Sequence, residues 1–363
     1  MTQQRSMEEL MYLIAFSKMK NIPDATKNEQ LIQFNSAKIL FDYCQQDSIL
    51  KKLFWPLDLA KREIEFIVKH QIQTYSIVDN HYPNRLKHCE DAPILLYQKG
   101  NGNFQVPYTL SIVGTRAHTR QAFTIIHELI EGLKHLNIAI ISGLALGIDS
   151  IAHQTALHHK IPTWAVLGHG LDQIYPTQNR KMAIEMLEQG GLLTEFTHQT
   201  SPMQFHFPKR NRIVAGMSDA TLVVETDTKG GSMITATQAF KYNRDVFAAP
   251  GKIHDPKSRG CLALIKNNIA HLYHDPLHFL EAMQWPLPPP SKSKIKNQQI
   301  SIQWDEIAKQ IIDFIDIHSP VNEETILEHF SMEPMILNAK LLDLELDGAI
   351  ERQAGNQYTR KIG

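Results

Sequence analysis

The sequence predicts an α/β fold whose largest part is a doubly wound, mostly parallel sheet. Two observations support this. Short apolar runs recur at near-regular intervals from about residue 108, and stretches of helical length separate them. Alternating buried strands and helices form βαβ units, in which helices cover both faces of a parallel sheet. The loops that follow the strands then emerge at one edge of the sheet, where ligands bind.

The elements are predicted in the following order. In residues 1–80 apolar side chains recur at spacings of three and four, as in Leu10, Leu13 and Phe16, which is typical of helices and predicts a small helical domain. In residues 81–285 we expect strands at 110–113, 138–141, 163–167, 192–193, 221–224, 246–248 and 269–272, and helices at 121–136, 149–158, 179–189 and 232–242.

The last part of the chain has a different composition. Residues 286–300 hold four prolines and three lysines and read as a semi-rigid linker. In 301–363, three helices (304–317, 322–330, 334–346) and a Gly-Asn hairpin turn predict a winged-helix domain. This domain carries 5 Lys and Arg against 12 Asp and Glu. Because like charges repel on a duplex, we expect it to contact protein rather than DNA.

Composition excludes several classes of protein. The chain has 363 residues, of which 43% are hydrophobic and 21% charged, with a net charge of −1. These values exclude disordered, collagen-like and disulfide-scaffold proteins. The sequence contains no apolar run of membrane-spanning length and no leader-like start, so we expect a cytoplasmic protein without membrane contact. The three cysteines have unrelated spacings, and no metal site or cofactor is expected.

Residues suited to binding an anion follow four of the predicted strands. Glycine lets a backbone approach an anion, arginine offers a fork that matches phosphate oxygens, and a helix N-terminus presents free N–H groups. The candidates are Gly114, Thr115 and Arg116 after the first strand, Gly143 and Gly147 after the second, and Gly230, Gly231 and Ser232 after the fifth. Tyr175, in the loop after the third strand, is a candidate for stacking a base. We expect Ser232 to cap the following helix. Together these loops predict a phosphate-bearing ligand.

A basic segment lies between the fourth and fifth strands. Residues 205–212 hold two aromatic and three cationic side chains, which suits a nucleic-acid strand whose phosphates meet cations and whose bases stack on rings. The candidate residues are Phe207, Lys209, Arg210, Asn211 and Arg212. We expect this segment to form a loop that meets Arg116 in one cationic crevice narrow enough for a single strand. The alternative is a solvated basic loop whose aromatic side chains belong to the core.

Other ligand classes are disfavoured. The Gly-x-Gly-x-x-Gly fingerprint of dinucleotide-binding proteins is incomplete, because Gln173 stands at the position of its third glycine. The Gly-Lys-Ser/Thr loop that binds nucleoside triphosphates is also missing, so an NAD enzyme or an ATPase is disfavoured. Asp149 and His153 lie four residues apart, on one face of a helix, and could form a metal-binding pair or an acid–base couple. A structural role is the simpler interpretation, in which Asp149 caps the helix and His153 is hydrogen-bonded locally.

Several ordered motifs resemble one known family. They include Val113–Arg116, Ser142–His153, Phe207–Arg212, Gly230–Ala236 and Val246–Gly251, within residues 80–275. The chain resembles the DNA-processing protein A (DprA, also called Smf) family of bacterial natural transformation.

The resemblance implies an extended Rossmann-like domain that binds single-stranded DNA, forms a homodimer and helps to load RecA, without catalysis. It also implies a SAM/HhH-like helical domain in front, and it carries the DNA pocket over to Gly114, Thr115, Arg116, Phe207 and Lys209–Arg212. The sequence departs from the family at Ala122, where glycine is usual, at Gly230, where serine is common, and at Asn267-Asn268 near the dimer-forming end.

The alternative function is a nucleotide-processing enzyme. Similar folds with paired glycines cleave nucleoside monophosphates, as in the phosphoribohydrolases. When their glycine pair is aligned on Gly230 and Gly231, Thr237 occupies the position of the catalytic glutamate. Because the glutamate that would act as general acid and base is missing, we expect a binding protein and not an enzyme.

Overall fold

The structure, a computed structural model, describes residues 5–20, 22–288, 305–346, 349–353 and 355–360. It divides into two compact units, Met1–Pro288 and Pro289–Gly363. Most of the predicted linker, 286–300, lies outside the described residues. No helix of the described ranges is long and apolar enough to cross a membrane.

A nine-stranded sheet forms the centre of the first unit. Its strand order is β1-β2-β6-β5-β4-β3-β7-β8-β9, and the seven strands from β6 to β9 in this order are parallel. The strands are β1 (Gln73–Ser76), β2 (Leu95–Lys99), β3 (Tyr108–Gly114), β4 (Ile138–Ser142), β5 (Thr163–Val166), β6 (Gly191–Thr194), β7 (Ala220–Val224), β8 (Asp245–Ala248) and β9 (His271–Leu272). The predicted α/β class and mostly parallel sheet are confirmed.

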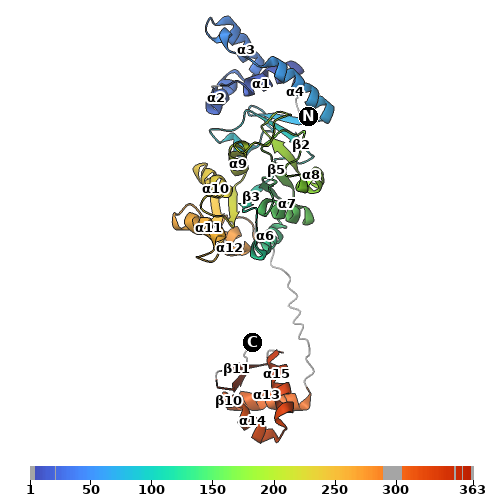
Figure 1. Ribbon diagram of the computed structural model, residues 1–363, viewed down its shortest axis with the longest axis vertical. Coiled ribbons are helices and arrows are strands. Elements are labelled where there is room, and N and C mark those ends of the chain that lie inside the picture. The colour runs from blue at the N-terminus through green and yellow to red at the C-terminus, as the bar shows by residue number, and fades with distance from the viewer. Residues whose placement is uncertain (1–4, 21, 289–304, 347–348, 354, 361–363) are drawn as a thin grey trace. The chain divides into compact units, whose positions relative to one another are not determined.

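Helices cover both faces of the sheet because successive strand side chains alternate between them. On β4, Ile140 packs in the core shared with α6 and α7, whereas Ile141 packs in the core shared with α9 and α10. Figure 1 shows α9 and α10 on one side of the central strands and α7 and α8 on the other. The helices are α5 (Asn84–Lys87), α6 (Arg120–Leu133), α7 (Ile148–His158), α8 (Arg180–Met186), α9 (His206–Gly216), α10 (Gly231–Lys241), α11 (Pro256–Lys266) and α12 (Pro276–Ala282).

Two features of this unit differ from the prediction. The basic segment expected to be a loop forms the start of α9, because the apolar run Ile213–Ala215 continues the segment and buries the helix. The sheet also extends beyond its parallel part through β1 and β2, which pair antiparallel. β1 begins at Gln73, ahead of the boundary predicted at residue 80.

The N-terminal helices belong to the same unit and pack against the sheet. They are α1 (Met7–Ser17), α2 (Asp24–Phe34), α3 (Ala37–Gln46) and α4 (Leu57–His70), with a 3-10 turn at Leu50–Lys52. Phe16 stacks on Trp55 with ring centroids 5.4 Å apart, and this core is continuous with the core under β2. Asn28 donates a hydrogen bond to the carbonyl oxygen of Ala92 at 2.8 Å, which fixes α2 beside the sheet.

The second unit has the predicted winged-helix fold. Its helices are α13 (Glu306–His318), α14 (Glu323–Phe330) and α15 (Pro334–Leu346), and its small sheet has the order β10-β12-β11. The strands are β10 (Val321–Asn322), β11 (Ile350–Gln353) and β12 (Gln357–Arg360). Gly355 and Asn356 both have positive φ, as the predicted hairpin turn requires.

Candidate nucleic-acid interface

A groove opens where the strand order of the sheet reverses. The chain builds β3, β4, β5 and β6 in one direction and then returns to place β7 against the other side of β3. The loops after β3 and β7 therefore diverge and leave a crevice at the carboxyl ends of these strands. The groove has a volume of about 320 Å³, and its lining includes Gly114, Thr115, Arg116, Asp149, Phe207, Arg210, Asn211, Gly230, Gly231 and Ser232.

Two arginines from distant parts of the chain meet in this groove. Arg116 follows β3, whereas Arg210 extends from α9, is only 5% exposed, and donates from Nη1 to the carbonyl oxygen of Val166 at 2.7 Å. The buried Nε of Arg210 has no partner among the described residues. The arginines of the described ranges that form ion pairs are Arg5, Arg85, Arg212 and Arg259, so neither arginine of the groove has a carboxylate within 4.0 Å there.

The environment of Arg210 disfavours its positive charge. The pKa of Arg210 is lowered to about 10, mainly by burial; the charge of Asp149 opposes this shift and the charge of Arg116 adds to it. The guanidinium is still charged at neutral pH. A desolvated cation without a carboxylate in contact is stabilised by any anion that enters the groove.

Asp149 shapes the wall of the groove. Its Oδ2 accepts the backbone N–H groups of Gly143 and Ala145 at 3.0 and 3.3 Å. Burial raises the pKa of Asp149, and the charge of Arg210 counteracts this shift. Asp149 thus holds the loop before α7, and not the helix start that we expected it to cap. Glycine at 143 makes room for the guanidinium of Arg210, because a Cβ there would lie 1.7 Å from Nη1.

His153 also has a structural role. Its Nδ1 lies 2.7 Å from Oγ1 of Thr163, which itself donates to the carbonyl oxygen of Ile140. The imidazole is fully buried, and burial, with a smaller effect of the Arg210 charge, lowers its pKa to about 3. His153 is therefore neutral and belongs to the core next to the groove.

The loops after β3 and β7 are hydrogen-bonded to each other at their first residues, before they diverge. Thr115 donates its N–H to the carbonyl oxygen of Glu225 at 2.7 Å, and a Cβ on Gly114 would lie 1.9 Å from the carbonyl oxygen of Val224. Gly147 has φ +81° and lies against the backbone of Thr115, behind the groove. Only glycine suits this close approach at positive φ.

The glycine loop before α10 differs from the prediction in one detail. Gly230 is the N-cap of the helix, and Ser232 donates to Oγ1 of Thr226 at 2.7 Å instead of capping. The groove is also lined by three residues that were not predicted as site residues, Thr226, Asp227 and Thr235. Thr226 and Asp227 follow closely after the predicted strand 221–224, and Thr235 lies one helical turn beyond Gly231. These positions could have identified them as residues of the site.

Two aromatic rings lie next to the cationic groove. The rings of Tyr175 and Phe207 have centroids 6.0 Å apart, and they line an adjoining hollow together with Arg116 and Leu146. Tyr175 is 45% exposed. Rings beside cations provide stacking faces for bases next to sites for phosphates.

The basic segment does not enter the groove as a whole. Successive residues of a helix point 100° apart, so α9 directs Phe207, Arg210 and Asn211 into the groove and turns the other two cations away. Arg212 lies 2.6 Å from Glu195, and Lys209 lies 3.4 Å from the same carboxylate. The expectation of one crevice holding all these residues is corrected: Lys209 and Arg212 lie at the opposite face of the helix.

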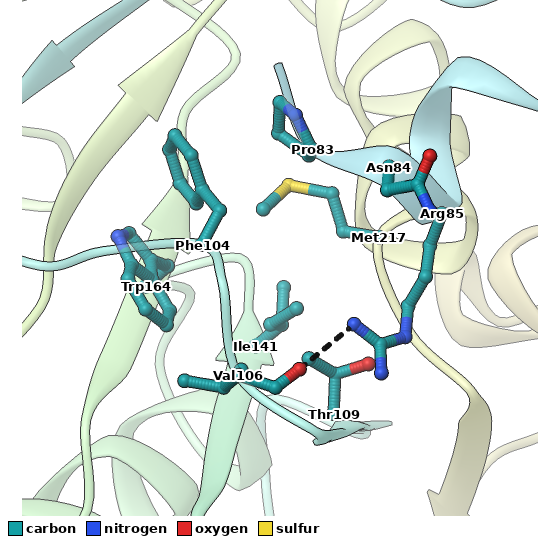
Figure 2. A pocket seen from close by; sticks show the side chains of 9 residues that line it. All are labelled: Pro83, Asn84, Arg85, Phe104, Val106, Thr109, Ile141, Trp164 and Met217. Carbon is teal, nitrogen blue, oxygen red and sulfur yellow. Dashed lines mark hydrogen bonds between the residues drawn. The ribbon is translucent and has the colours of Figure 1, made fainter. Parts of the chain in front are cut away.

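A small pocket elsewhere has different chemistry. Figure 2 shows its lining, in which Phe104, Ile141, Trp164 and Met217 present apolar surfaces while Arg85 donates to the carbonyl oxygen of Val106 at 3.2 Å. Arg85 is also paired with Asp219 at 2.5 Å. This pocket shares no lining residue with the groove, and its one cation is already neutralised.

Comparisons with known proteins give the family. The profile described as "DNA recombination-mediator protein A" matches residues 73–284, which include the whole groove. The chain belongs to this family. The profile described as "DprA winged helix domain" matches residues 295–356, in agreement with the fold of the second unit. The resemblance inferred from the motifs is confirmed.

Individual family members cover most of the chain. It is 37% identical to DNA processing protein DprA of Streptococcus pneumoniae over 223 residues, which are 61% of this chain and 78% of the relative. It is 35% identical to protein Smf of Escherichia coli over 286 residues, which are 77% of this chain and 75% of the relative.

Two solved structures of family members are similar in fold. The X-ray structure of S. pneumoniae DprA matches with a TM-score of 0.61 and 31% identity, over 76% of this chain and 98% of that one. DNA processing protein A from Helicobacter pylori matches with a TM-score of 0.53 and 30% identity, over 59% and 96%. That structure is described as giving insights into a single-stranded DNA binding mode.

Proposed function

We propose that this chain is a non-catalytic, single-stranded DNA-binding recombination mediator, which protects incoming strands and loads RecA during natural transformation. The observation that carries the proposal is the buried guanidinium of Arg210, which faces the groove beside Arg116 without a carboxylate in contact among the described residues. Phosphates of a strand supply the missing negative charge. The single-stranded DNA binding described for the H. pylori relative supports the same ligand.

The shape of the site favours a single strand over a duplex. Arg210 lies at the bottom of the groove, so a phosphate must enter the crevice to reach it. The rings of Tyr175 and Phe207 offer faces on which a base can stack only when it is not paired in a helix.

The lining of the groove also supports binding rather than catalysis. Its carboxylates, among the described residues, are Asp149 and Asp227. Asp149 accepts two backbone N–H groups, which holds it as part of the wall. Thr237, at the position of a phosphoribohydrolase glutamate, is not part of the lining. We further propose a homodimer through the Rossmann-like domain and a winged-helix domain that contacts protein.

The binding proposal is tested with a labelled oligothymidine and the matching duplex in an anisotropy titration. Arg116→Ala and Arg210→Met are each expected to weaken single-strand binding about tenfold, since each removes a charged contact worth about 1.5 kcal/mol. The slope of log K against log salt is expected to fall by about 0.7 per lost phosphate contact. Arg62→Ala, which removes an exposed arginine of α4, is the control. Unchanged affinity in both groove variants would refute the site.

The mediator role needs a second assay. RecA filament formation on single strands coated with a single-strand-binding protein is expected to depend on this chain and on Arg116. Filament formation that is equally fast without the chain contradicts the loading role while leaving the DNA site in place.

A further inference from the structure

A second cationic pocket lies where the N-terminal helices meet the sheet. It has a volume of about 310 Å³ and shares no residue with the groove. Its lining includes Lys18, Asp24 and Lys27 from the helical part, Glu195 and Thr197 after β6, and Lys209 of α9. We call it the junction pocket.

Two of its lysines have no carboxylate as a close partner. Lys18 donates to the backbone carbonyl oxygen of Glu195 at 2.8 Å, and Lys27 donates to the carbonyl oxygen of Ser17 at 3.1 Å. Lys27 is only 4% exposed, and its nearest carboxylate contact, with Asp24, is 3.9 Å long. Burial lowers the pKa of both lysines, that of Lys18 to about 8.

The carboxylates of the junction pocket are already shared by other cations. Oε2 of Glu195 lies 2.6 Å from Arg212 and 3.4 Å from Lys209, and Oδ2 of Asp24 lies 3.5 Å from Arg212. The lining thus holds three lysines against two carboxylates, both of which Arg212 also contacts. The charge of Glu63 acts on Lys18 from outside the lining, and Lys27 has only the 3.9 Å contact with Asp24. The hydroxyl groups of Thr197 and Thr200 add neutral donors to the lining.

Both pockets open at the same edge of the sheet. The groove lies at the carboxyl ends of β3 and β7, and the junction pocket lies just beyond the carboxyl end of β6. β6 is three strands away from β3, which corresponds to about 14 Å. Helix α9 contributes to both, with Arg210 on one face and Lys209 on the other.

A cluster of rings, of which Phe205 is exposed, lies at the N-terminal end of α9. Phe205 is 67% exposed and contacts His206 with ring centroids 4.4 Å apart. His206 in turn lies 4.4 Å from the ring of Phe196, over which the ammonium of Lys209 is placed at 5.9 Å. Phe205, the exposed ring of this cluster, offers a stacking face to a strand that passes over the end of the helix.

We propose that the junction pocket binds a phosphate ester through Lys18 and Lys27, as a second contact for a DNA strand that continues from the groove over the N-terminal end of α9. This inference rests on the proposed function for the source of the phosphate. A free nucleotide has the same chemistry, and the experiment separates the two sources.

The test uses the full chain with Lys18→Met and Lys27→Met combined, which removes two charges but keeps the apolar stems. Lys61→Met, which removes an exposed lysine from the neighbouring α4, is the control. Oligothymidines from a dinucleotide to about 16 nucleotides are titrated. We expect the double variant to bind the longest oligomer about tenfold more weakly, with a salt slope smaller by about 0.7 for each lost phosphate contact, and the shortest with unchanged affinity. The Lys18→Arg, Lys27→Arg variant, which keeps the charges, is expected to retain most of the affinity.

Thymidine monophosphate is titrated by calorimetry to identify the source. Heat that persists in Arg116→Ala but is lost in the double methionine variant assigns the pocket to a free nucleotide and refutes the strand as its source. If the double methionine variant loses affinity equally for short and long oligomers, the junction pocket is overturned and the proposed function stands. The same conclusion follows if this variant loses affinity for none of the oligomers while Arg116→Ala binds them more weakly. A defect in neither variant overturns both. A thermal melt of each variant identifies loss caused by misfolding.

Discussion

The Nη2 atom of Arg212 lies 2.6 Å from Oε2 of Glu195, on the face of α9 opposite to Arg210, and both side chains are more than nine-tenths buried. This contact gives Arg212 a structural role. Arg212→Met leaves Glu195 buried without its nearest counter-charge, which costs about 3 kcal/mol for pairs of this kind. The urea midpoint of unfolding is expected to fall accordingly.

The control for this prediction is Arg259→Met. Arg259 pairs with Asp227 at 3.3 Å, but both side chains are about half exposed, and such pairs contribute about 0.5 kcal/mol. A variant of Arg212 that keeps the midpoint of the wild-type chain but no longer binds the shortest oligothymidines would contradict the structural assignment.

Gly143, which lines the adjoining hollow, and Gly231, which lines the groove, form a matched pair of substitutions. A Cβ on Gly143 would overlap the guanidinium of Arg210, whereas a Cβ on Gly231 meets nothing within 4 Å. Gly143→Ala is therefore expected to displace Arg210 and weaken single-strand binding about tenfold, the value of one charged contact. Gly231→Ala is expected to preserve affinity and to stabilise α10 slightly. The measurement is an anisotropy titration with a thermal melt of each variant, and equal affinities would disprove the steric argument.

The buried imidazole of His153 predicts a pH dependence of stability. Its pKa is about 3 in the folded chain and about 6.5 in an unfolded chain. Between these values the unfolded state binds a proton that the folded state does not. The free energy of unfolding therefore falls as the pH falls below 6.5, by about 1.4 kcal/mol per pH unit from this group.

The check is a series of urea unfolding curves between about pH 7 and pH 5, a range that brackets the ordinary pKa of histidine. His153→Gln is expected to have a lower stability at pH 7 but a flatter pH profile. The exposed His81→Gln should keep the slope of the wild-type chain. Parallel profiles for all three chains would show that His153 takes up its proton in the folded state.

The winged-helix unit is expected to add nothing to DNA affinity. The lysine of α15 is paired with Asp305, and the same helix carries Asp343 and Glu345. A chain that ends at Pro288, the boundary between the units, should bind oligothymidine at least as tightly as the full chain at equal salt. Weaker binding by the shortened chain, or duplex binding that requires residues 289–363, would contradict an acidic domain that contacts protein.

The central sheet could be predicted from the sequence because its strands are continuous apolar runs. The predicted strand 138–141 ends one residue before β4 does, and the predicted strand 221–224 begins one residue after β7 does. The groove residues after β3 and before α10 followed from this, since parallel strands end at one edge. β1 and β2 were missed because they are antiparallel additions to the sheet, and the pattern that announces a βαβ unit does not include them.

The orientation of α9 could not be predicted in the same way. Its charges suggested a loop, and the apolar residues Ile213–Ala215, which make it a helix, follow only after them. The direction of Arg212 depends on Glu195 at the end of β6, a contact that local sequence does not encode. Arg116 and Arg210 lie in one groove, as predicted. Lys209 and Arg212 could have joined them only if the segment formed a loop, and it forms a helix instead.

The reversal of strand order has a consequence for the growing polypeptide. A nascent chain that has left the ribosome as far as α8 already carries Arg116 but lacks α9 and β7, and therefore one whole wall of the crevice. Partial products and C-terminally clipped fragments of this kind would lack the groove in which we propose that DNA binds. Under that proposal a strand binds only to the completed sheet, and a bound strand would in turn protect the finished chain from unfolding by mass action.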